Sequence, residues 1–296
     1  MDMNIYDKIT VIKENAVSYH AKRIAAQLVF ALKMSQTHEN AYDDVIRKAA
    51  AYLYDELERS GCITNQASVK CEEMLLPLGS MAKKYKIHCV SHAHIDMNWM
   101  WSFNETVAIT LDTFRTLLKL MDDYPLLTFS QSQASTYRIV EEYDPSMFER
   151  IRQKVAEGRW EVTASTWVET DKNMPSGESL ARHILYTKKY FKEKFGLDSD
   201  SLQLDFEPDT FGHSMSVPEI LRKGNVRYYY HCRGYDGHYI YNWTAPSGES
   251  ILVCRDQGWY NSVITPDSFE CVPEFCKKYD IDIMLKVFGM GDHGGG

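Results

Sequence analysis

The pattern of apolar and polar residues divides the chain into two parts. From residue 5 to about residue 60, apolar residues recur at helical spacing among good helix formers, and the second run ends at Gly61, as a helix C-cap would. This pattern predicts an all-helical segment, which we assign to residues 1–84. From residue 85 onward, short apolar runs typical of strands alternate with longer amphipathic runs typical of helices.

The alternation predicts an α/β domain with a parallel sheet, because strand–helix–strand repeats connect strands that run in the same direction. We expect strands near residues 86–90, 126–130, 160–165, 202–206, 227–231, 250–254 and 282–288. We expect helices at residues 105–122, 135–157, 177–195, 214–224 and 268–279. Such a sheet is either doubly wound or closed as a barrel, and we assign this domain to residues 85–296.

Polar residues follow most of the predicted strands, and this position favours the barrel. In parallel α/β folds the carboxyl ends of the strands converge, so residues that are far apart in the sequence meet there. The polar segments at these ends are residues 92–96, 130–133, 167–171, 207–214, 232–233 and 291–293. The sequence therefore predicts a functional site that is built from several strand ends.

His92, His94 and Asp96 directly follow the first predicted strand. Residues at alternate positions of an extended chain point to the same side, so these side chains should share one face. Imidazole nitrogens and carboxylate oxygens on one face are ligands for a divalent metal, which needs one or two more from other segments. The alternative is a hydrogen-bonded core histidine beside a surface aspartate. Three such groups in this spacing, with Trp99 and Trp101 close behind, favour the metal site.

Composition excludes several classes of protein. The 296 residues are 44% hydrophobic, so the chain can bury a sizeable core, and its net charge of −8 includes no long run of one sign that would bind nucleic acid. No apolar run reaches the roughly 18 residues that a membrane span needs, and the N-terminus lacks a signal-peptide pattern. The seven cysteines form no C-x-x-C pair. We expect a cytoplasmic protein without nucleic-acid or membrane partners. Whether it forms a homo-oligomer is left open.

Absent motifs narrow the chemistry further. The chain has no G-x-S-x-G elbow, phosphate-binding glycine loop or dinucleotide fingerprint, which disfavours serine-hydrolase and nucleotide chemistry. Carboxylates, histidines, an arginine and tryptophans remain at the strand ends. Two carboxylates beside an aromatic-lined pocket can hydrolyse a glycosidic bond, because one protonates the leaving oxygen while the other attacks or activates water. A metal in the same pocket would bind sugar hydroxyls.

Four segments resemble glycoside hydrolase family 38, the retaining α-mannosidases. HAHIDMNW contains the family's His-x-Asp-x-x-Trp opening motif, and DTFGHS at residues 209–214 is similar to the segment that holds its nucleophile. WVETDKNMPSGES at residues 167–179 and the closing GDHGGG are also similar. The resemblance covers roughly residues 70–296, and it implies that the catalytic domain is a seven-stranded parallel β/α barrel.

The resemblance also implies roles for single residues. His94, Asp96 and Asp209 would bind a divalent metal, and Asp209 would also be the nucleophile. Asp292, the only carboxylate in the closing glycine-rich turn, would be the acid/base. Trp99 would form the stacking floor for a mannose ring. Zinc suits the mixed histidine and carboxylate set best, with cobalt, manganese and calcium as alternatives.

Further residues are candidates for contacts with a mannose-containing oligosaccharide. By the same resemblance, Arg233 would lie beside the nucleophile. Glu169 and Asp171 either line the pocket or cap the next predicted helix, and Trp167 close by favours the pocket. Tyr260, on a predicted loop, is a further candidate.

The chain departs from the family in one respect. Family members carry another metal-binding histidine in a later His-His-Asp-x-x-Thr-Gly segment, which this sequence does not contain. We therefore expect the amino-terminal portion of a longer enzyme, which would be inactive by itself if that ligand is required. Two alternatives stay open. One is a metal-dependent amidohydrolase that uses the His92 and His94 pair with His231, and the other is a non-catalytic barrel that binds carbohydrate.

Overall fold

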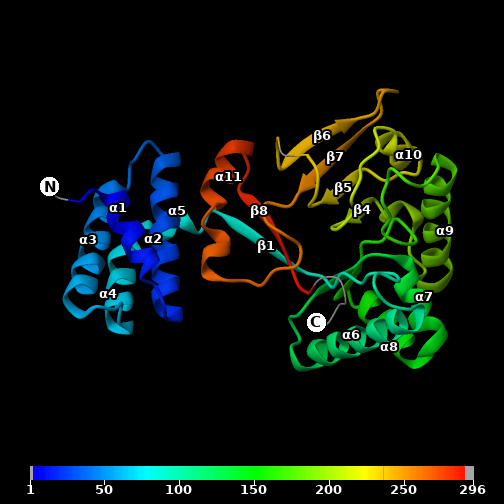
Figure 1. The fold of residues 1–296 in the computed structure, drawn as a ribbon, viewed down its shortest axis with the longest axis horizontal. Helices are drawn as coiled ribbons and strands as arrows, with labels where there is room; N and C mark the ends of the chain where they lie inside the picture. The colour runs from blue at the N-terminus through cyan, green and yellow to red at the C-terminus, as the bar shows by residue number, and fades with distance from the viewer. Residues whose placement is uncertain (1–2, 236, 291–296) are drawn as a thin grey trace. The chain divides into compact units, whose positions relative to one another are not determined.

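The computed structural model describes residues 3–235 and 237–290, which divide into two compact units (Figure 1). The first holds the described residues up to His88 together with Ile264–Leu285. The second holds Cys89–Val263 and the described residues from Lys286 onward. Within these described ranges, no helix combines the length and the apolar character that crossing a membrane requires.

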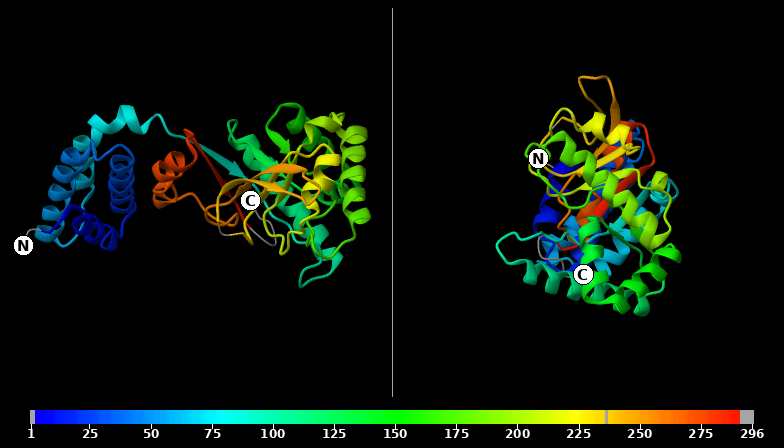
Figure 2. Two further views of the ribbon diagram at one scale, coloured as in Figure 1. Left: turned by 90° about the horizontal axis from the view of Figure 1, so that it is seen from above. Right: turned by 90° about the vertical axis from the view of Figure 1, so that its right-hand side faces the viewer.

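The first unit is built mainly from helices (Figures 1 and 2). They are α1 (Ile5–Glu14), α2 (Tyr19–Thr37), α3 (Asp43–Ser60), α4 (Asn65–Leu75), the 3-10 segment η1 (Leu76–Leu78) and α5 (Gly79–Ala82). Asn4, Ser18 and Thr64 begin α1, α2 and α4, because each side chain accepts a hydrogen bond from the backbone N–H three residues later. Gly61, in the left-handed conformation, ends α3. The buried faces of the helices share one apolar core.

Residues 264–285 also belong to the first unit. Their two helical segments, η3 (Pro266–Phe269) and α11 (Val272–Tyr279), both contact α2. Ion pairs join them to the N-terminal helices, with Lys13 Nζ 2.5 Å from Glu270 Oε2 and Lys33 Nζ 2.8 Å from Glu274 Oε2. The N-terminal helices are therefore packed against a segment that lies about 200 residues later in the chain.

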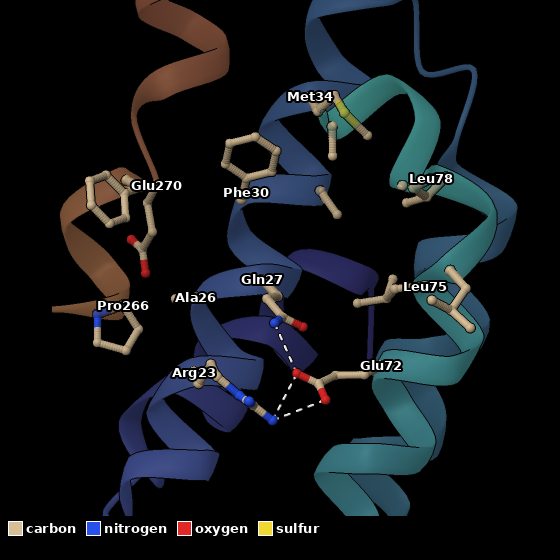
Figure 3. A pocket seen from close by; sticks show the side chains of 15 residues that line it. Arg23, Ala26, Gln27, Phe30, Met34, Glu72, Leu75, Leu78, Pro266 and Glu270 are labelled. Atoms are coloured by element: carbon tan, nitrogen blue, oxygen red, sulfur yellow. Dashed lines mark hydrogen bonds and ion pairs between the residues drawn. The ribbon is translucent and has the colours of Figure 1, made fainter. Parts of the chain in front are cut away.

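The first unit contains an open cavity of about 600 Å³ (Figure 3). Apolar side chains of α2 and of the segment from Leu75 to Ala82 form most of its wall. At one end, Glu72 accepts hydrogen bonds from Arg23 (3.0 Å) and Gln27 (2.9 Å). None of the residues predicted to carry chemistry lines this cavity, so the functional site has to be sought elsewhere.

From residue 86 onward the chain alternates strands and helices. The predicted strands are present as β1 (Lys86–Ser91), β2 (Phe129–Gln131), β3 (Trp160–Val162), β4 (Leu204–Glu207), β5 (Tyr228–His231), β7 (Ser250–Arg255) and β8 (Ile283–Phe288). A further strand, β6 (Ile240–Thr244), was not predicted. It forms an antiparallel hairpin with β7, and its mixture of aromatic and polar residues lacks the apolar run by which the other strands were recognised.

The described strands form three hydrogen-bonded sheets. β1 pairs with β8, β2 pairs in parallel with β3, and the third sheet has the order β4–β5–β7–β6. β4, β5 and β7 run in parallel, whereas β6 is antiparallel to β7. A bridge between His92 and Ser130 links the ends of β1 and β2. The fold is therefore α/β, but the closed seven-stranded barrel that the resemblance implies does not appear in the hydrogen bonding of these strands.

The helices between the strands lie close to their predicted places. They are α6 (Phe103–Asp123), α7 (Ala134–Tyr143), α8 (Pro145–Ala156), α9 (Gly177–Phe195), the 3-10 segment η2 (Ser199–Ser201) and α10 (Val217–Lys223). The single helix predicted at residues 135–157 is wrong. Pro145 has no N–H with which to continue α7, and Asp144 begins α8 instead by accepting a hydrogen bond from the backbone N–H of Met147 at 3.0 Å.

Apolar side chains cover both faces of the β4–β5–β7–β6 sheet. On one face, the rings of Phe206 and Tyr230 stack with centroids 4.4 Å apart, next to Tyr260. On the other face, Tyr229 packs with apolar residues of α9 and α10, and both helices lie beside the sheet in Figure 1. The C-terminal ends of β4 and β5 are thereby held in place, and the polar segments that follow them start from a rigid base.

Candidate active site

Three side chains from strand ends meet in the second unit. His94 and Asp96 come shortly after β1, and Asp209 follows the end of β4. One ligand atom from each lies within 4.8 Å of the other two. His94 Nε2 is 3.2 Å from Asp96 Oδ1 and 4.0 Å from Asp209 Oδ2. The structure thus brings together the three residues that were predicted as metal ligands, and we call them the His94 group.

His92 does not join the His94 group. Its Nδ1 is 3.0 Å from the carbonyl oxygen of Ser130, and its ring centroid lies 4.6 Å from that of Phe206. Burial lowers the pKa of His92 to about 3, so the ring is neutral. The regular alternation that would place His92 on the same face ends with β1 at Ser91.

Glu169 connects His94 with Asp209. Its Oε2 lies 3.1 Å from His94 Nδ1, and its Oε1 accepts a hydrogen bond from the backbone N–H of Asp209 at 2.5 Å. The backbone N–H of Glu169 donates to Gln133 Oε1 (3.0 Å), and Gln133 Nε2 donates to the carbonyl oxygen of Ile95 (2.8 Å). Glu169 and Gln133 therefore fix the segment after β1 against the segment after β4.

The donor atoms of the His94 group fit a divalent metal. His94 Nδ1 faces the Glu169 carboxylate and His94 Nε2 faces the two aspartates, so with the proton on Nδ1 it is Nε2 that would bind a metal. Burial by itself lowers the pKa of His94, but the charges of Glu169 and Asp96 outweigh it and raise the pKa to about 10. The proton on Nε2 therefore offsets part of the negative charge of Asp96 and Asp209. A divalent cation at the same place would offset more of this charge. One imidazole nitrogen and two carboxylates are a donor set that zinc accepts.

Arg233 lies beside Asp209. Its Nε and Nη2 donate to Asp209 Oδ1 at 2.8 Å and 2.5 Å, so Oδ2 is the oxygen that faces His94. The guanidinium lies over the ring of Phe211 (4.4 Å to the centroid) and over that of Trp259 (4.7 Å). Phe211 and Trp259 were not predicted as part of the site, since an aromatic residue in a loop has no signal that separates stacking on a cation from core packing.

Two of the predicted sugar contacts, Tyr260 and Trp99, differ in their surroundings. The ring of Tyr260 is buried edge-on against His94, with centroids 5.1 Å apart. Burial, together with the charges of Asp209, Glu169 and Asp96, raises the pKa of the Tyr260 hydroxyl, which keeps it neutral. Trp99 is 55% exposed, and its ring meets that of Trp101 edge-on with centroids 5.5 Å apart.

The other predicted residues have different surroundings. Trp167 packs edge-on against Tyr190, a core residue, with ring centroids 5.6 Å apart. Asp171 Oδ1 accepts the backbone N–H of Asn173 at 2.9 Å, which makes a local turn. Asp292 lies outside the described residues.

A second charged cluster was missed by the prediction. Lys172 Nζ lies 3.0 Å from Asp205 Oδ2 and 2.7 Å from Glu207 Oε1, and all three side chains are buried. Burial lowers the pKa of Lys172, but the charges of the two carboxylates outweigh it and raise the pKa above its ordinary value. Burial raises the pKa of Glu207, against the effect of Lys172. A lysine in a polar loop is normally exposed, so the sequence carried no signal for this cluster.

A histidine and two carboxylates that meet where strands of an α/β unit end make this a candidate active site. Residues 84–296 match the family described as glycosyl hydrolases family 38 N-terminal domain, and the chain belongs to this family.

Two known proteins with similar sequences are named alpha-mannosidases. The chain is 35% identical over 221 residues to alpha-mannosidase G of Dictyostelium discoideum, a match that covers 71% of this chain and 20% of that protein. It is 30% identical over 223 residues to alpha-mannosidase 2C1 of Homo sapiens, covering 72% of this chain and 21% of that protein. The chain thus spans about a fifth of the length of these relatives.

A solved structure is similar as well. The crystal structure of an alpha-mannosidase from Enterococcus faecalis V583 superposes with a TM-score of 0.60 at 20% identity, over 71% of this chain and 25% of that one. At this identity the likeness establishes a shared fold.

Proposed function

We propose that the protein carrying this chain is a retaining α-mannosidase that removes terminal α-linked mannose from glycans or oligosaccharides. Membership of the family and the names of its relatives support this activity. The observation that carries it is the His94 group, with Asp209 held between Arg233 and Glu169. The proposal includes a closed seven-stranded barrel as the fold of the catalytic domain, beginning near residue 85.

In this proposal Asp209 is the nucleophile and Asp292 is the acid/base. Asp292 protonates the departing oxygen while Asp209 attacks the anomeric carbon and forms a glycosyl ester. Asp292 then takes a proton from water, which attacks the same carbon and releases Asp209. Retention requires the two carboxyl groups to stand about 5 to 5.5 Å apart. Arg233 and Glu169 keep the carboxylate and the backbone of Asp209 in one orientation.

The metal belongs to the same proposal. His94 Nε2, Asp96 and Asp209 would hold a divalent ion, for which zinc is our first choice. Such an ion would bind hydroxyl groups of the sugar and stabilise charge that develops during the reaction. The exposed indole of Trp99 would stack on the mannose ring.

The amidohydrolase alternative receives no support from the surroundings of His231. Its Nδ1 is 2.6 Å from the carbonyl oxygen of Arg233, and its Nε2 is 2.9 Å from the hydroxyl of Tyr241. Both ring nitrogens are therefore occupied away from the His94 group.

Replacement of the nucleophile tests the proposal. In the protein that carries this chain, Asp209→Asn should lower turnover of an aryl α-mannoside about 1000-fold or more, because the amide cannot form the glycosyl ester. Asp112→Asn, an exposed residue of α6, is the matched control and should leave turnover unchanged. Proton NMR early in the reaction should show the α-anomer of mannose. Release of the β-anomer, or full activity of Asp209→Asn, would contradict the assignment.

A further inference from the structure

The cluster formed by Lys172, Asp205 and Glu207, here called the Lys172 cluster, is locked by hydrogen bonds as well as by charge. Ser165 Oγ donates to Asp205 Oδ1 at 2.9 Å, and Thr166 Oγ1 donates to Glu207 Oε1 at 3.0 Å. Lys172 is 2% exposed and both carboxylates are 0% exposed. Buried charges are costly unless they are paired and hydrogen-bonded, so these side chains have little freedom to move.

The positions of the cluster residues in the chain connect it with the candidate active site. Lys172 comes three residues after Glu169, and Glu207 comes two residues before Asp209. The cluster therefore joins the same two segments that Glu169 joins through its contact with the backbone N–H of Asp209. A displacement of Lys172 from β4 would move Glu169 as well, because so few residues separate them.

The backbones of the two segments are also in direct contact. Thr210 Oγ1 donates to the carbonyl oxygen of Thr170 at 2.6 Å, and the backbone N–H of Lys172 donates to the carbonyl oxygen of Gly212 at 3.2 Å. Gly212 leaves no room for a side chain, since a Cβ there would lie 2.1 Å from Asn173 Nδ2. The loop over residues 165–173 is thus tightly packed on the segment after β4.

Stability alone does not account for the choice of residues in the cluster. A buried cation with two carboxylates keeps a large desolvation cost, and apolar residues of similar volume often stabilise a protein as well or better. In some proteins buried ionic groups instead serve to fix one geometry, and groups that support metal ligands need a fixed geometry.

We propose that Lys172 is a positioning residue: the Lys172 cluster fixes the 165–173 loop on β4 and so holds Glu169 against His94 and Asp209. The placement of Glu169 follows from the contacts of this chain, whereas its effect on metal binding rests on the proposed function. Two separate measurements therefore test the two parts.

The first experiment uses a variant that removes every charge of the cluster. In Lys172→Met/Asp205→Asn/Glu207→Gln no carboxylate is left unpaired, so the chain should fold with an unchanged circular dichroism spectrum. Hydrogen exchange at the backbone amide of Asp209 should be at least about tenfold faster, because the bond to Glu169 is loosened. Zinc affinity, measured by calorimetry on the same chain, should fall about 10- to 100-fold, as is typical when the support of a metal ligand is removed.

A double-mutant cycle separates positioning from a general loss of order. Glu169→Ala removes the contact itself, so the triple variant in that background should cause no further loss of zinc affinity. Additive losses would overturn the inference, and so would wild-type exchange at Asp209 in the triple variant.

Absence of zinc binding and failure of the triple variant to fold would each leave one measurement that still tests the inference. If the wild-type chain binds no zinc, the metal part of the proposed function fails, and exchange at Asp209 alone decides the positioning role. If the triple variant does not fold, Thr166→Val removes one hydrogen bond from Glu207 without leaving a charge unpaired. That variant should also accelerate exchange at Asp209, and unchanged exchange would overturn the inference.

Discussion

At the scale of single residues, the buried ring of His231 contributes to the response of the fold to acid. Burial, with a smaller effect from His213, lowers the pKa of His231 to about 4. In an unfolded chain a histidine titrates near 6.5. Between these two values the unfolded state binds more protons than the folded state, so stability falls as the pH falls through this window.

We expect His231→Gln to reduce this dependence on pH. Protonation of the unfolded state at this position should lower the free energy of unfolding of the wild-type chain by up to about 3 kcal/mol between pH 6.5 and pH 4. Denaturant titrations at several pH values measure it, and the difference between the two chains removes the contribution of the carboxylates. The variant will be less stable at pH 7 but should lose less on acidification. Parallel curves would show that His231 is not the group responsible.

The candidate site could be predicted where chemistry and strand ends coincide. His94, Asp96 and Asp209 belong to short polar motifs after apolar strands, and the structure brings them together. Gln133 and Lys172 gain their surroundings only from tertiary packing, since their partners lie 33 to 38 residues away in the sequence. No local pattern identifies such contacts.

At the scale of the elements, the end of β8 depends on a glycine. Gly289 has φ +145°, and a Cβ there would lie 1.7 Å from the carbonyl oxygen of His92. Its N–H donates to the carbonyl oxygen of Ser262 at 2.9 Å, so the backbone cannot easily move away. Three segments of the second unit are therefore packed together around this one position.

Gly289→Ala should lower the free energy of unfolding by more than about 2 kcal/mol, because the methyl group forces backbone atoms apart. Gly158→Ala is the matched control. Gly158 also has a positive φ, +72°, but a Cβ there would meet nothing within 4 Å, so only the conformational cost of about 1 kcal/mol applies. Chemical denaturation compares the two variants, and equal losses would mean that close packing at Gly289 is unimportant.

The elements themselves could be predicted better than their boundaries and pairing. Apolar runs located the strands from β1 to β8, with the exception of β6. The break between α7 and α8 was readable in principle, because Pro145 follows a residue that caps helices. Whether the strands close into a barrel could not be predicted from the pattern of apolar and polar residues, since closure depends on hydrogen bonds between strands that are distant in the sequence.

At the scale of the whole molecule, the N-terminal helices and residues 264–285 share one unit. We expect a chain that begins at residue 85 to be impaired, because the deletion removes α2 and so uncovers the faces of η3 and α11 that contact it. The truncated chain should bind more of the dye ANS than the full chain and should aggregate on size-exclusion chromatography.

The matched comparison for this deletion is a chain that lacks Met3 only, which lies before Asn4, the cap residue of α1. It should behave like the full chain. A monomeric truncated chain with unchanged dye binding would show that η3 and α11 do not need the N-terminal helices. The sequence could not predict that residues 264–285 belong to the unit of the N-terminal helices. The pattern of apolar and polar residues typical of alternating strands and helices continues through this segment without a change.

The pairing of β1 with β8 means that β1 is synthesised long before its partner strand. The two strands run in the same direction, with Lys86 N–H bonded to Asp282 O and His92 N–H bonded to Phe288 O. About 190 residues separate them, which a ribosome adds in about 10 to 40 s at 5 to 20 residues per second. Throughout that interval the β8-facing edge of β1 has no partner, and α2 lacks η3 and α11. The first helices to emerge are therefore among the last to gain all their packing partners. Until β8 is made, the nascent chain presents an unpaired edge of β1, and such edges promote aggregation.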